Sequence, residues 1–147
     1  MKGEPIVILL VEDDASHAEI VRRNFEDCRL ANRLMHVADG QAALDYLNHR
    51  DAFSDPATAP RPGIILLDLR LPKVDGLEVL KSIKSDPKLS SIPVVILTTS
   101  KAEMDMVKAY SLHANSYLVK PVDFMKFTEL MTTFGFYWVA WNQCPHE

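Results

Sequence analysis

The sequence predicts an α/β fold in which a parallel sheet is covered by helices on both faces. The first observation is a set of short apolar runs rich in β-branched residues, the densest being Ile6–Val11, Ile64–Leu67 and Val94–Leu97. Proline, glycine or acidic residues bound these runs, which are typical of strands buried on both faces of a sheet. The second observation is that longer stretches with helical periodicity alternate with the runs, which indicates parallel strands. Right-handed crossovers between such strands place helices on both faces.

Each element can be assigned in order along the chain. The five predicted strands are Ile6–Val11, Leu34–Ala38, Ile64–Leu67, Val94–Leu97 and Ser116–Val119. The five predicted helices lie near Ala15–Cys28, Gln41–His49, Leu77–Ser85, Lys101–Leu112 and Asp123–Thr133. In the first helix, Ala18, Val21 and Phe25 recur at the spacing of one helix face. Connections are short except for Arg50–Gly63, whose three prolines predict a surface loop.

Length, charge and cysteine content exclude several classes of function. The 147 residues suit one domain, so a catalytic domain joined to a separate regulatory domain is not expected. A formal net charge of −4 without any Lys/Arg-rich block argues against nucleic-acid binding. The first apolar run is too short for a secretion signal or a membrane span. The two distant cysteines, Cys28 and Cys144, indicate no metal or disulfide framework, and we expect a cytoplasmic protein.

Polar residues follow four of the five predicted strands. The acids Glu12, Asp13 and Asp14 follow the first strand, Asp68 ends the third, Thr98 ends the fourth and Lys120 follows the fifth. In an open α/β sheet, ligands bind beyond the carboxyl ends of the strands. Each residue also has a structural interpretation. Asp13 or Asp14 could cap the first helix, Asp68 could begin a turn, Thr98 could simply favour the strand and Lys120 could be a solvated loop charge.

Clustered carboxylates without histidine or cysteine ligands suit a hard divalent cation, and Mg²⁺ is preferred where a phosphate shares the site. A carboxylate can act as a nucleophile toward phosphorus and form an aspartyl-phosphate. The cation, Lys120 and the hydroxyl of Thr98 would then stabilise the phosphoryl oxygens. Neither a Walker loop nor a G-x-G-x-x-G motif is present. The expected substrate is therefore a phosphoryl group rather than a nucleotide.

Four ordered motifs resemble those of the receiver domains of two-component response regulators. The segment LLVEDD carries Glu12 and Asp13 at the positions of the family's acidic pair. ILLDLRLPKVDG carries Asp68 at the phosphoacceptor position. IPVVILTTS carries Thr98 at the switch-threonine position, and NSYLVKPV carries Tyr117 and Lys120 at the switch-aromatic and invariant-lysine positions. The resemblance implies a flavodoxin-like, doubly wound (βα)5 three-layer sandwich with sheet order 2-1-3-4-5.

The resemblance also implies the role of each site residue. Asp13, Asp68 and the backbone carbonyl of Arg70 would hold Mg²⁺, or Mn²⁺ in its place, with Glu12 acting directly or through water. Asp68 would accept the phosphoryl group from the phosphohistidine of a histidine kinase. Thr98 and Lys120 would contact the new phosphate, and Tyr117 would turn inward as Thr98 moves. The Lys120–Pro121 peptide is expected to be cis, as is typical of the family.

Three positions depart from the family's commoner residues. Glu12 stands where aspartate is more frequent, which lengthens its reach toward the metal. Arg70 stands two residues after the acceptor, where a smaller or polar residue is frequent, and its side chain could alter the access of water to the phosphate. Thr99 stands where alanine, glycine or serine is usual, so the entry for the phosphate is expected to be narrower.

The long loop and the C-terminal tail narrow the resemblance to stand-alone receivers paired with phytochrome-type histidine kinases. We expect a receiver domain over residues 1–134, an aromatic tail over 135–147 and no output domain. Five aromatic residues gather near this end of the chain, namely Phe134, Phe136, Tyr137, Trp138 and Trp141. They either pack within the chain or form a docking or self-association surface, and we expect a homodimer through the fifth helix and tail.

The expected function is that of a single-domain response regulator that signals by protein contact or passes its phosphate onward. It would not be an enzyme beyond promoting its own Mg²⁺-dependent phosphorylation and dephosphorylation. One alternative is a Mg²⁺-dependent hydrolase with an aspartyl-phosphate intermediate, which usually has a second aspartate where Arg70 stands. The other is a degenerate receiver that acts only as a scaffold. Partners are a sensor histidine kinase and a second copy of the chain, without nucleic acid or membrane.

Overall fold

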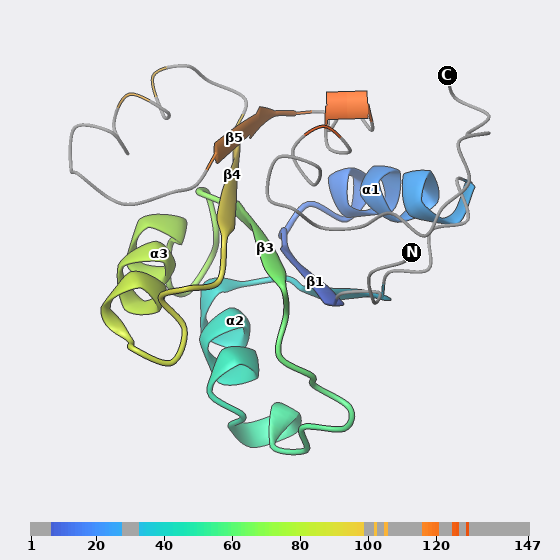
Figure 1. The fold of residues 1–147 in the computed structure, drawn as a ribbon. Coiled ribbons are helices and arrows are strands. Elements are labelled where there is room, and N and C mark those ends of the chain that lie inside the picture. The colour runs from blue at the N-terminus through green and yellow to red at the C-terminus, as the bar shows by residue number, and fades with distance from the viewer. Residues whose placement is uncertain are drawn as a thin grey trace.

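Five parallel strands form the centre of the computed structural model, which describes residues 7–27, 33–98, 102, 105, 116–120, 125, 126 and 129. The strands are β1 (Val7–Val11), β2 (Arg33–Val37), β3 (Ile64–Asp68), β4 (Val94–Thr98) and β5 (Ser116–Val119). Their order in the sheet is β2-β1-β3-β4-β5, and every neighbouring pair is parallel. The predicted α/β class and the 2-1-3-4-5 order are therefore confirmed (Figure 1).

The described helices cover both faces of the sheet. Helix α1 (Ala15–Asp27) lies on one side, and α2 (Gly40–Leu47) and α3 (Gly76–Ser85) lie on the other (Figure 1). The predicted helices over 101–112 and 123–133 fall largely outside the described residues. The described members of these stretches are helical, namely Ala102, Asp105, Met125, Lys126 and Glu129. No helix in the described ranges is long and apolar enough to cross a membrane.

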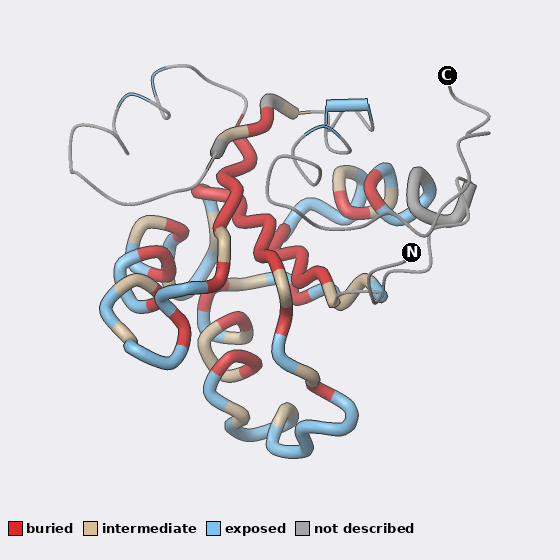
Figure 2. Tube along the Cα trace, viewed as in Figure 1, coloured by how far each residue is buried: buried red, intermediate tan, exposed pale blue. Residues whose placement is uncertain are grey.

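The sheet interior explains the continuous apolar runs. Every residue of β3 and β4 is buried, whereas β2, at the edge, has two exposed, two partly buried and one buried residue (Figure 2). Leu9, Ile65 and Val94 are neighbours in register and join one core with α2 and α3. Since strand side chains alternate between faces, the intervening residues point toward the side of α1. Because these strands are buried on both faces, their continuous apolar runs predict them from the sequence.

An aspartate caps the N-terminus of each of the helices α1, α2 and α3. Asp39 Oδ1 accepts a hydrogen bond from the backbone N–H of Ala42 at 2.7 Å, and Asp75 Oδ1 accepts one from that of Glu78 at 3.1 Å. Asp14 Oδ1 accepts from the N–H groups of Ser16 and His17 at 2.8 and 3.2 Å. Such caps satisfy backbone donors that have no partner within the helix. Asp14 is thus the acid that caps α1, which leaves Asp13 to the edge of the sheet.

The loop between α2 and β3 is predicted to lie on the surface, but contacts with α2 and the core anchor it. It contains a short 3₁₀ helix, η1 (Asp51–Phe53), and most of its residues are exposed. However, Ala59 is buried, the hydroxyl of Tyr46 donates to the carbonyl of Pro60 at 2.8 Å, and His49 Nε2 lies 2.8 Å from the carbonyl oxygen of Ala59. This loop leads into the start of β3, at the opposite end of that strand from Asp68.

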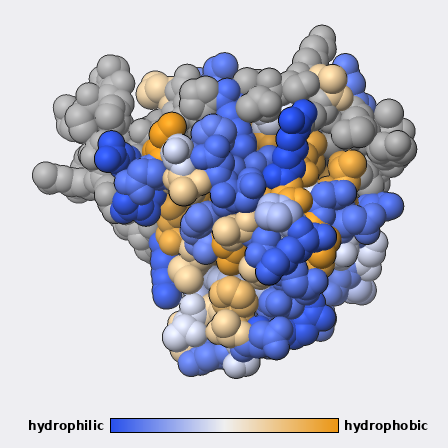
Figure 3. Space-filling model, turned by 180° about the vertical axis from the view of Figure 1, so that it is seen from behind, coloured by the Kyte–Doolittle hydropathy of each residue, from blue (hydrophilic) through white to orange (hydrophobic). Residues whose placement is uncertain are grey.

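The described surface is largely polar. Hydrophilic residues cover most of the face that is turned away from the viewer in Figure 1, with hydrophobic residues between them (Figure 3). Among the large hydrophobic side chains with described burial, Ile20 and Met125 are the exposed ones, at 39% and 56%.

Candidate functional site

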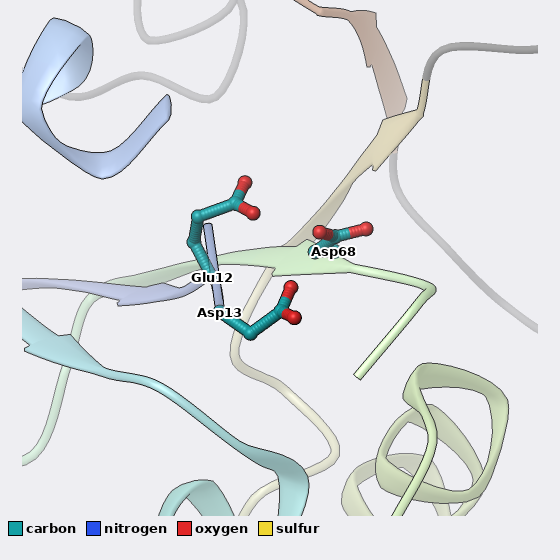
Figure 4. Close-up of side chains that lie close together, drawn as sticks. All are labelled: Glu12, Asp13 and Asp68. Carbon is teal, nitrogen blue, oxygen red and sulfur yellow. The ribbon is translucent and has the colours of Figure 1, made fainter. Parts of the chain in front are cut away.

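Three carboxylates meet at the carboxyl edge of the sheet. Glu12 and Asp13 directly follow β1, and Asp68 is the last residue of β3. Because Val11 and Leu67 are partners in register, the residues that follow them lie side by side. Carboxylate oxygens of all three acids lie within 4.8 Å of one another, and Figure 4 shows the side chains converging. Glu12 and Asp68 are buried, whereas Asp13 is exposed.

Lys120 inserts its ammonium group between the two buried acids. Its Nζ lies 2.7 Å from Oδ2 of Asp68 and 2.8 Å from Oε1 of Glu12, and its side chain is 7% exposed. The backbone N–H of Lys120 donates to the carbonyl of Thr98 at 2.8 Å, which fixes the chain just beyond β5. The parallel pairing of β4 and β5 therefore delivers this lysine to the acids of β1 and β3.

Histidine 17 is a third partner of the same ammonium. His17 Nδ1 lies 3.2 Å from Lys120 Nζ, at the first turn of α1. An ammonium only donates hydrogen bonds, so Nδ1 is the acceptor in this contact. Lys120 thus has two carboxylates and one imidazole as acceptors.

Burial and mutual repulsion perturb the charges of this cluster. Burial, aided by the neighbouring Asp68, raises the pKa of Glu12 to about 7, although Lys120 opposes the rise. Burial alone would lower the pKa of Lys120, but hydrogen bonds to Asp68 and Glu12 outweigh it and raise that pKa. Outside the buried cluster, backbone N–H groups of His17 and Ser16 lower the pKa of Asp14. The charge of Glu12 at neutral pH therefore depends on a nearby cation.

The donor set fits a divalent cation with a preference for oxygen. With Glu12, Asp13 and Asp68 ionised, three negative charges face the one positive charge of Lys120, which leaves a net charge of −2. Carboxylate oxygens are the ligands that Mg²⁺ and Mn²⁺ take most readily. The backbone N–H of Arg70 donates to Asp68 Oδ1 at 3.0 Å, so one oxygen of this acid is already oriented.

The carboxylates open onto a cavity of about 270 Å³. Its lining comprises Glu12, Asp13, Asp14, His17, Asp68, Arg70 and Lys120. A second cavity of about 550 Å³ also contacts Asp13 and Arg70 and is otherwise lined by Leu69, Leu71, Pro72, Asp75 and Leu77. The acidic cluster is thus accessible to a small anion or a partner side chain.

The other predicted site residues occupy distinct places. Thr98 is buried at the end of β4, and Tyr117 is half-buried in β5 against the core that α2 and α3 cover. Burial raises the pKa of Tyr117. The side chain of Arg70 is exposed at the mouth of the acidic cavity. Thr99, the Lys120–Pro121 peptide, the cysteines and the aromatic tail lie outside the described residues.

Two histidines of the site were not predicted. His17 contacts Lys120, and His36 Nε2 lies 2.8 Å from the backbone carbonyl oxygen of Glu12. A signal for His17 exists in the sequence, because it lies three residues after the cap Asp14 and therefore above the end of β1. His36 carries no comparable signal, since the pairing of β2 beside β1 has to be known first.

The response regulator receiver domain family matches residues 8–132 of the chain. A probable methanogenesis regulatory protein, FilR2 of Methanothrix harundinacea, is 45% identical over 97% of this chain and 89% of its own length. The response regulator Rcp1 of Synechocystis is 39% identical over 96% of this chain and 94% of its own length.

Solved structures of response regulators are also similar to this chain. The bacteriophytochrome response regulator RtBRR has a TM-score of 0.83 at 45% identity and covers 97% of this chain and 85% of its own. The Mn²⁺-bound form of Rcp1 has a TM-score of 0.71 at 40% identity, with 88% and 91% covered. The phosphorylated cyanobacterial phytochrome response regulator RcpA has a TM-score of 0.73 at 37% identity, with 89% and 91% covered.

Proposed function

Because the chain belongs to the response regulator receiver family, we propose that it is a phosphorylation switch in which Asp68 accepts a phosphoryl group from a histidine kinase. The observation that carries the proposal is the position of Asp68 Oδ2, 2.7 Å from the ammonium of Lys120 and within a cluster of three carboxylates. The family works by two-component signalling, so a histidine kinase is its partner, and its members are not conventional enzymes.

The proposed transfer is a displacement at phosphorus. A carboxylate oxygen of Asp68 attacks the phosphorus of the kinase's phosphohistidine. A P–O bond forms as the P–N bond to the histidine breaks, and the released imidazole nitrogen takes up a proton from water. Lys120, which pairs with Asp68 at rest, then donates to the phosphoryl oxygens and offsets their charge. The hydroxyl of Thr98, at the end of the neighbouring strand, is the proposed second donor.

Mg²⁺, with Mn²⁺ able to replace it, is the proposed cofactor. Asp13, Asp68 and the backbone carbonyl of Arg70 would hold it, and Glu12 would bind directly or through water. When bound, the cation neutralises charge on the carboxylates and on the phosphoryl oxygens. The net charge of the cluster and the manganese bound to the related Rcp1 support this assignment.

The proposed output is a change of surface. As Thr98 moves toward the phosphate, the ring of Tyr117 turns further into the core that it already contacts. A local charge event would thereby change the face formed by β5 and the residues that precede it. Within this proposal, residues 1–134 form the cytoplasmic receiver and 135–147 the aromatic tail.

The proposed kinase is of the phytochrome type, because solved structures of phytochrome response regulators cover nearly the whole chain at up to 45% identity. A homodimer through the fifth helix and the tail is also part of the proposal. Sedimentation of the full chain with and without a phosphate analogue tests it, since a single monomeric species in both would contradict the dimer.

Two other functions make different predictions. A hydrolase with an aspartyl-phosphate intermediate needs a general acid near the nucleophile, and the guanidinium of Arg70 does not release a proton at neutral pH. A degenerate scaffold would lack a competent acceptor.

Incubation with Mg²⁺ and phosphoramidate, followed by intact-mass analysis, distinguishes the response regulator, the hydrolase and the scaffold hypotheses. The proposal predicts one acid-stable, base-labile phosphoryl adduct that does not form in EDTA. Rapid turnover of phosphate esters would support the hydrolase, and the absence of any adduct would support the scaffold.

A further inference from the structure

The backbone that carries the acidic pair is held by β2 on both sides of Glu12. β1 ends at Val11, but the N–H of Glu12 still donates to the carbonyl of Val37 at 3.1 Å. On the other side of the residue, His36 Nε2 lies 2.8 Å from the carbonyl oxygen of Glu12. A side chain therefore continues the contact between the two strands where their backbone pairing stops.

The chemistry of this contact is fixed by the acceptor. A carbonyl oxygen only accepts hydrogen bonds, so the proton lies on Nε2 of His36 and the imidazole is the donor. The side chain itself is exposed, in the edge strand β2. Its hydrogen bond to Glu12 is therefore not a by-product of core packing.

The held carbonyl belongs to the planar peptide that joins Glu12 to Asp13. Rotation about the Cα–C bond of Glu12 would turn this peptide and move the Cα of Asp13, and with it the carboxylate that faces Asp68. Asp13 is the exposed member of the cluster, so packing restrains it less than it restrains Glu12. The orientation of the peptide consequently determines how closely the three carboxylates converge.

We propose that His36 is a positioning residue for the metal site, because it holds the Glu12–Asp13 peptide in the orientation that brings Asp13 within reach of Asp68. This inference rests on the metal binding in the proposed function. It adds a residue outside the carboxylate cluster, on the neighbouring strand, that sets the affinity of the site.

The test is a titration of the purified protein with Mn²⁺ at one fixed pH, in which electron paramagnetic resonance reports the free ion. Loss of an outer partner of a metal ligand typically weakens affinity by about 10–100-fold. Since His36 acts through the backbone, we expect His36→Leu to raise the dissociation constant for Mn²⁺ about tenfold, at the lower end of that range. His36→Gln keeps an N–H donor and should stay within about threefold of the parent protein.

The matched control is His49→Asn. His49 Nε2 also contacts a backbone carbonyl oxygen, that of Ala59, at the same distance of 2.8 Å, but it lies in the loop before β3. Its backbone φ of 54° is one that asparagine tolerates. This variant should leave the Mn²⁺ affinity unchanged, and thermal unfolding of all variants checks that they are folded.

Each result decides the question. A folded His36→Leu that binds Mn²⁺ as tightly as the parent would overturn the inference, as would a His36→Gln as weak as the leucine variant. Failure of the parent protein to bind Mn²⁺ would instead overturn the proposed metal site, and with it this role of His36.

Discussion

Lys120 Nζ and Asp68 Oδ2 lie 2.7 Å apart, although 52 residues separate them in the chain. Both side chains are almost fully buried, at 7% and 6% exposure; Asp68 ends β3, Lys120 follows β5, and β4 lies between these two strands in the sheet. The contact places a cation against the proposed acceptor before any phosphate arrives. Such preorganised charge is what stabilises the developing charge of a transferred phosphoryl group.

Removing the ammonium of Lys120 should destabilise the protein, because two buried acids then lose their counter-charge. Lys120→Met leaves Glu12 and Asp68 without their ammonium, and loss of one partner from a buried ion pair typically costs about 3–5 kcal/mol. We expect the free energy of unfolding in EDTA to fall by about 3 kcal/mol. Urea unfolding measures it, and Mg²⁺ should restore part of the loss because it supplies positive charge to the same cluster.

The control for this variant is Lys73→Met. Lys73 pairs with Asp39 at 3.7 Å, but its side chain is 68% exposed. Its replacement should change the free energy of unfolding by less than about 1 kcal/mol. If Mg²⁺ stabilised Lys120→Met no more than the parent protein, the charge balance assigned to the cluster would be wrong.

Repulsion among the carboxylates predicts that removing the charge of the exposed Asp13 stabilises the metal-free protein. Asp13→Asn removes one of three like charges that lie within 4.8 Å of one another. We expect it to stabilise the metal-free protein by about 1 kcal/mol, since charges about 4 Å apart near a surface repel by at least that much. The same variant should lose most of the stabilisation by Mg²⁺. Parallel urea titrations in EDTA and in Mg²⁺ measure both, and stabilisation by Mg²⁺ equal to that of the parent would contradict the assignment of Asp13 as a ligand.

The start of α2 is packed too tightly for any side chain at Gly40. A Cβ there would overlap the carbonyl oxygen of Val74, in the loop that follows Asp68. Gly40→Ala must displace this loop, and such overpacking typically costs about 1–3 kcal/mol. Thermal unfolding measures the loss. The neighbouring exposed variant Gln41→Ala should differ from the parent by less than about 0.5 kcal/mol, and an equal effect of both would contradict the close contact.

Tyr46 links α2 to the long loop and makes stability depend on pH. Tyr46→Phe removes the hydrogen bond to the carbonyl of Pro60 and should cost about 1 kcal/mol. Burial raises the pKa of the Tyr46 phenol above its ordinary value of 10.0, against a weaker opposing effect of Arg33. A raised pKa means that the folded state holds the phenol proton more tightly than the unfolded state. The contribution of the Tyr46 hydroxyl to stability is therefore complete below pH 10.0 and is lost as pH rises through the pKa of the folded state.

The difference in unfolding free energy between the parent and Tyr46→Phe should therefore be constant below about pH 10 and shrink above it. Urea titrations at several alkaline pH values measure this difference. A difference that grew with pH would show that the sign of the shift is wrong.

The sequence was most informative where burial is symmetric. β3 and β4 are buried on both faces, so their apolar runs predicted the strands directly, and the acids, Thr98 and Lys120 could be placed at one edge from chain order. β2 begins at Arg33 instead of Leu34, because this edge strand starts at an exposed charged residue and so has no apolar boundary. The choice between Asp13 and Asp14 as helix cap needed backbone geometry, which assigned the cap to Asp14.

The contact of His36 with the site was beyond prediction, because it depends on the pairing of β2 beside β1. Anchoring of the long loop likewise depends on a single hydroxyl, that of Tyr46, which its position in a helix does not reveal.

The central claim, that Asp68 is the phosphoacceptor, is tested most directly by locating the phosphoryl group. The protein is incubated with Mg²⁺ and phosphoramidate and reduced with borohydride, which converts an aspartyl-phosphate to homoserine, and its peptides are then sequenced by mass spectrometry. Homoserine at position 68 is the expected result, with no incorporation in Asp68→Asn. Full incorporation is expected in the control Asp55→Asn, which lies in the loop before β3. Undiminished incorporation in Asp68→Asn, or homoserine at another aspartate of the parent protein, would contradict the account.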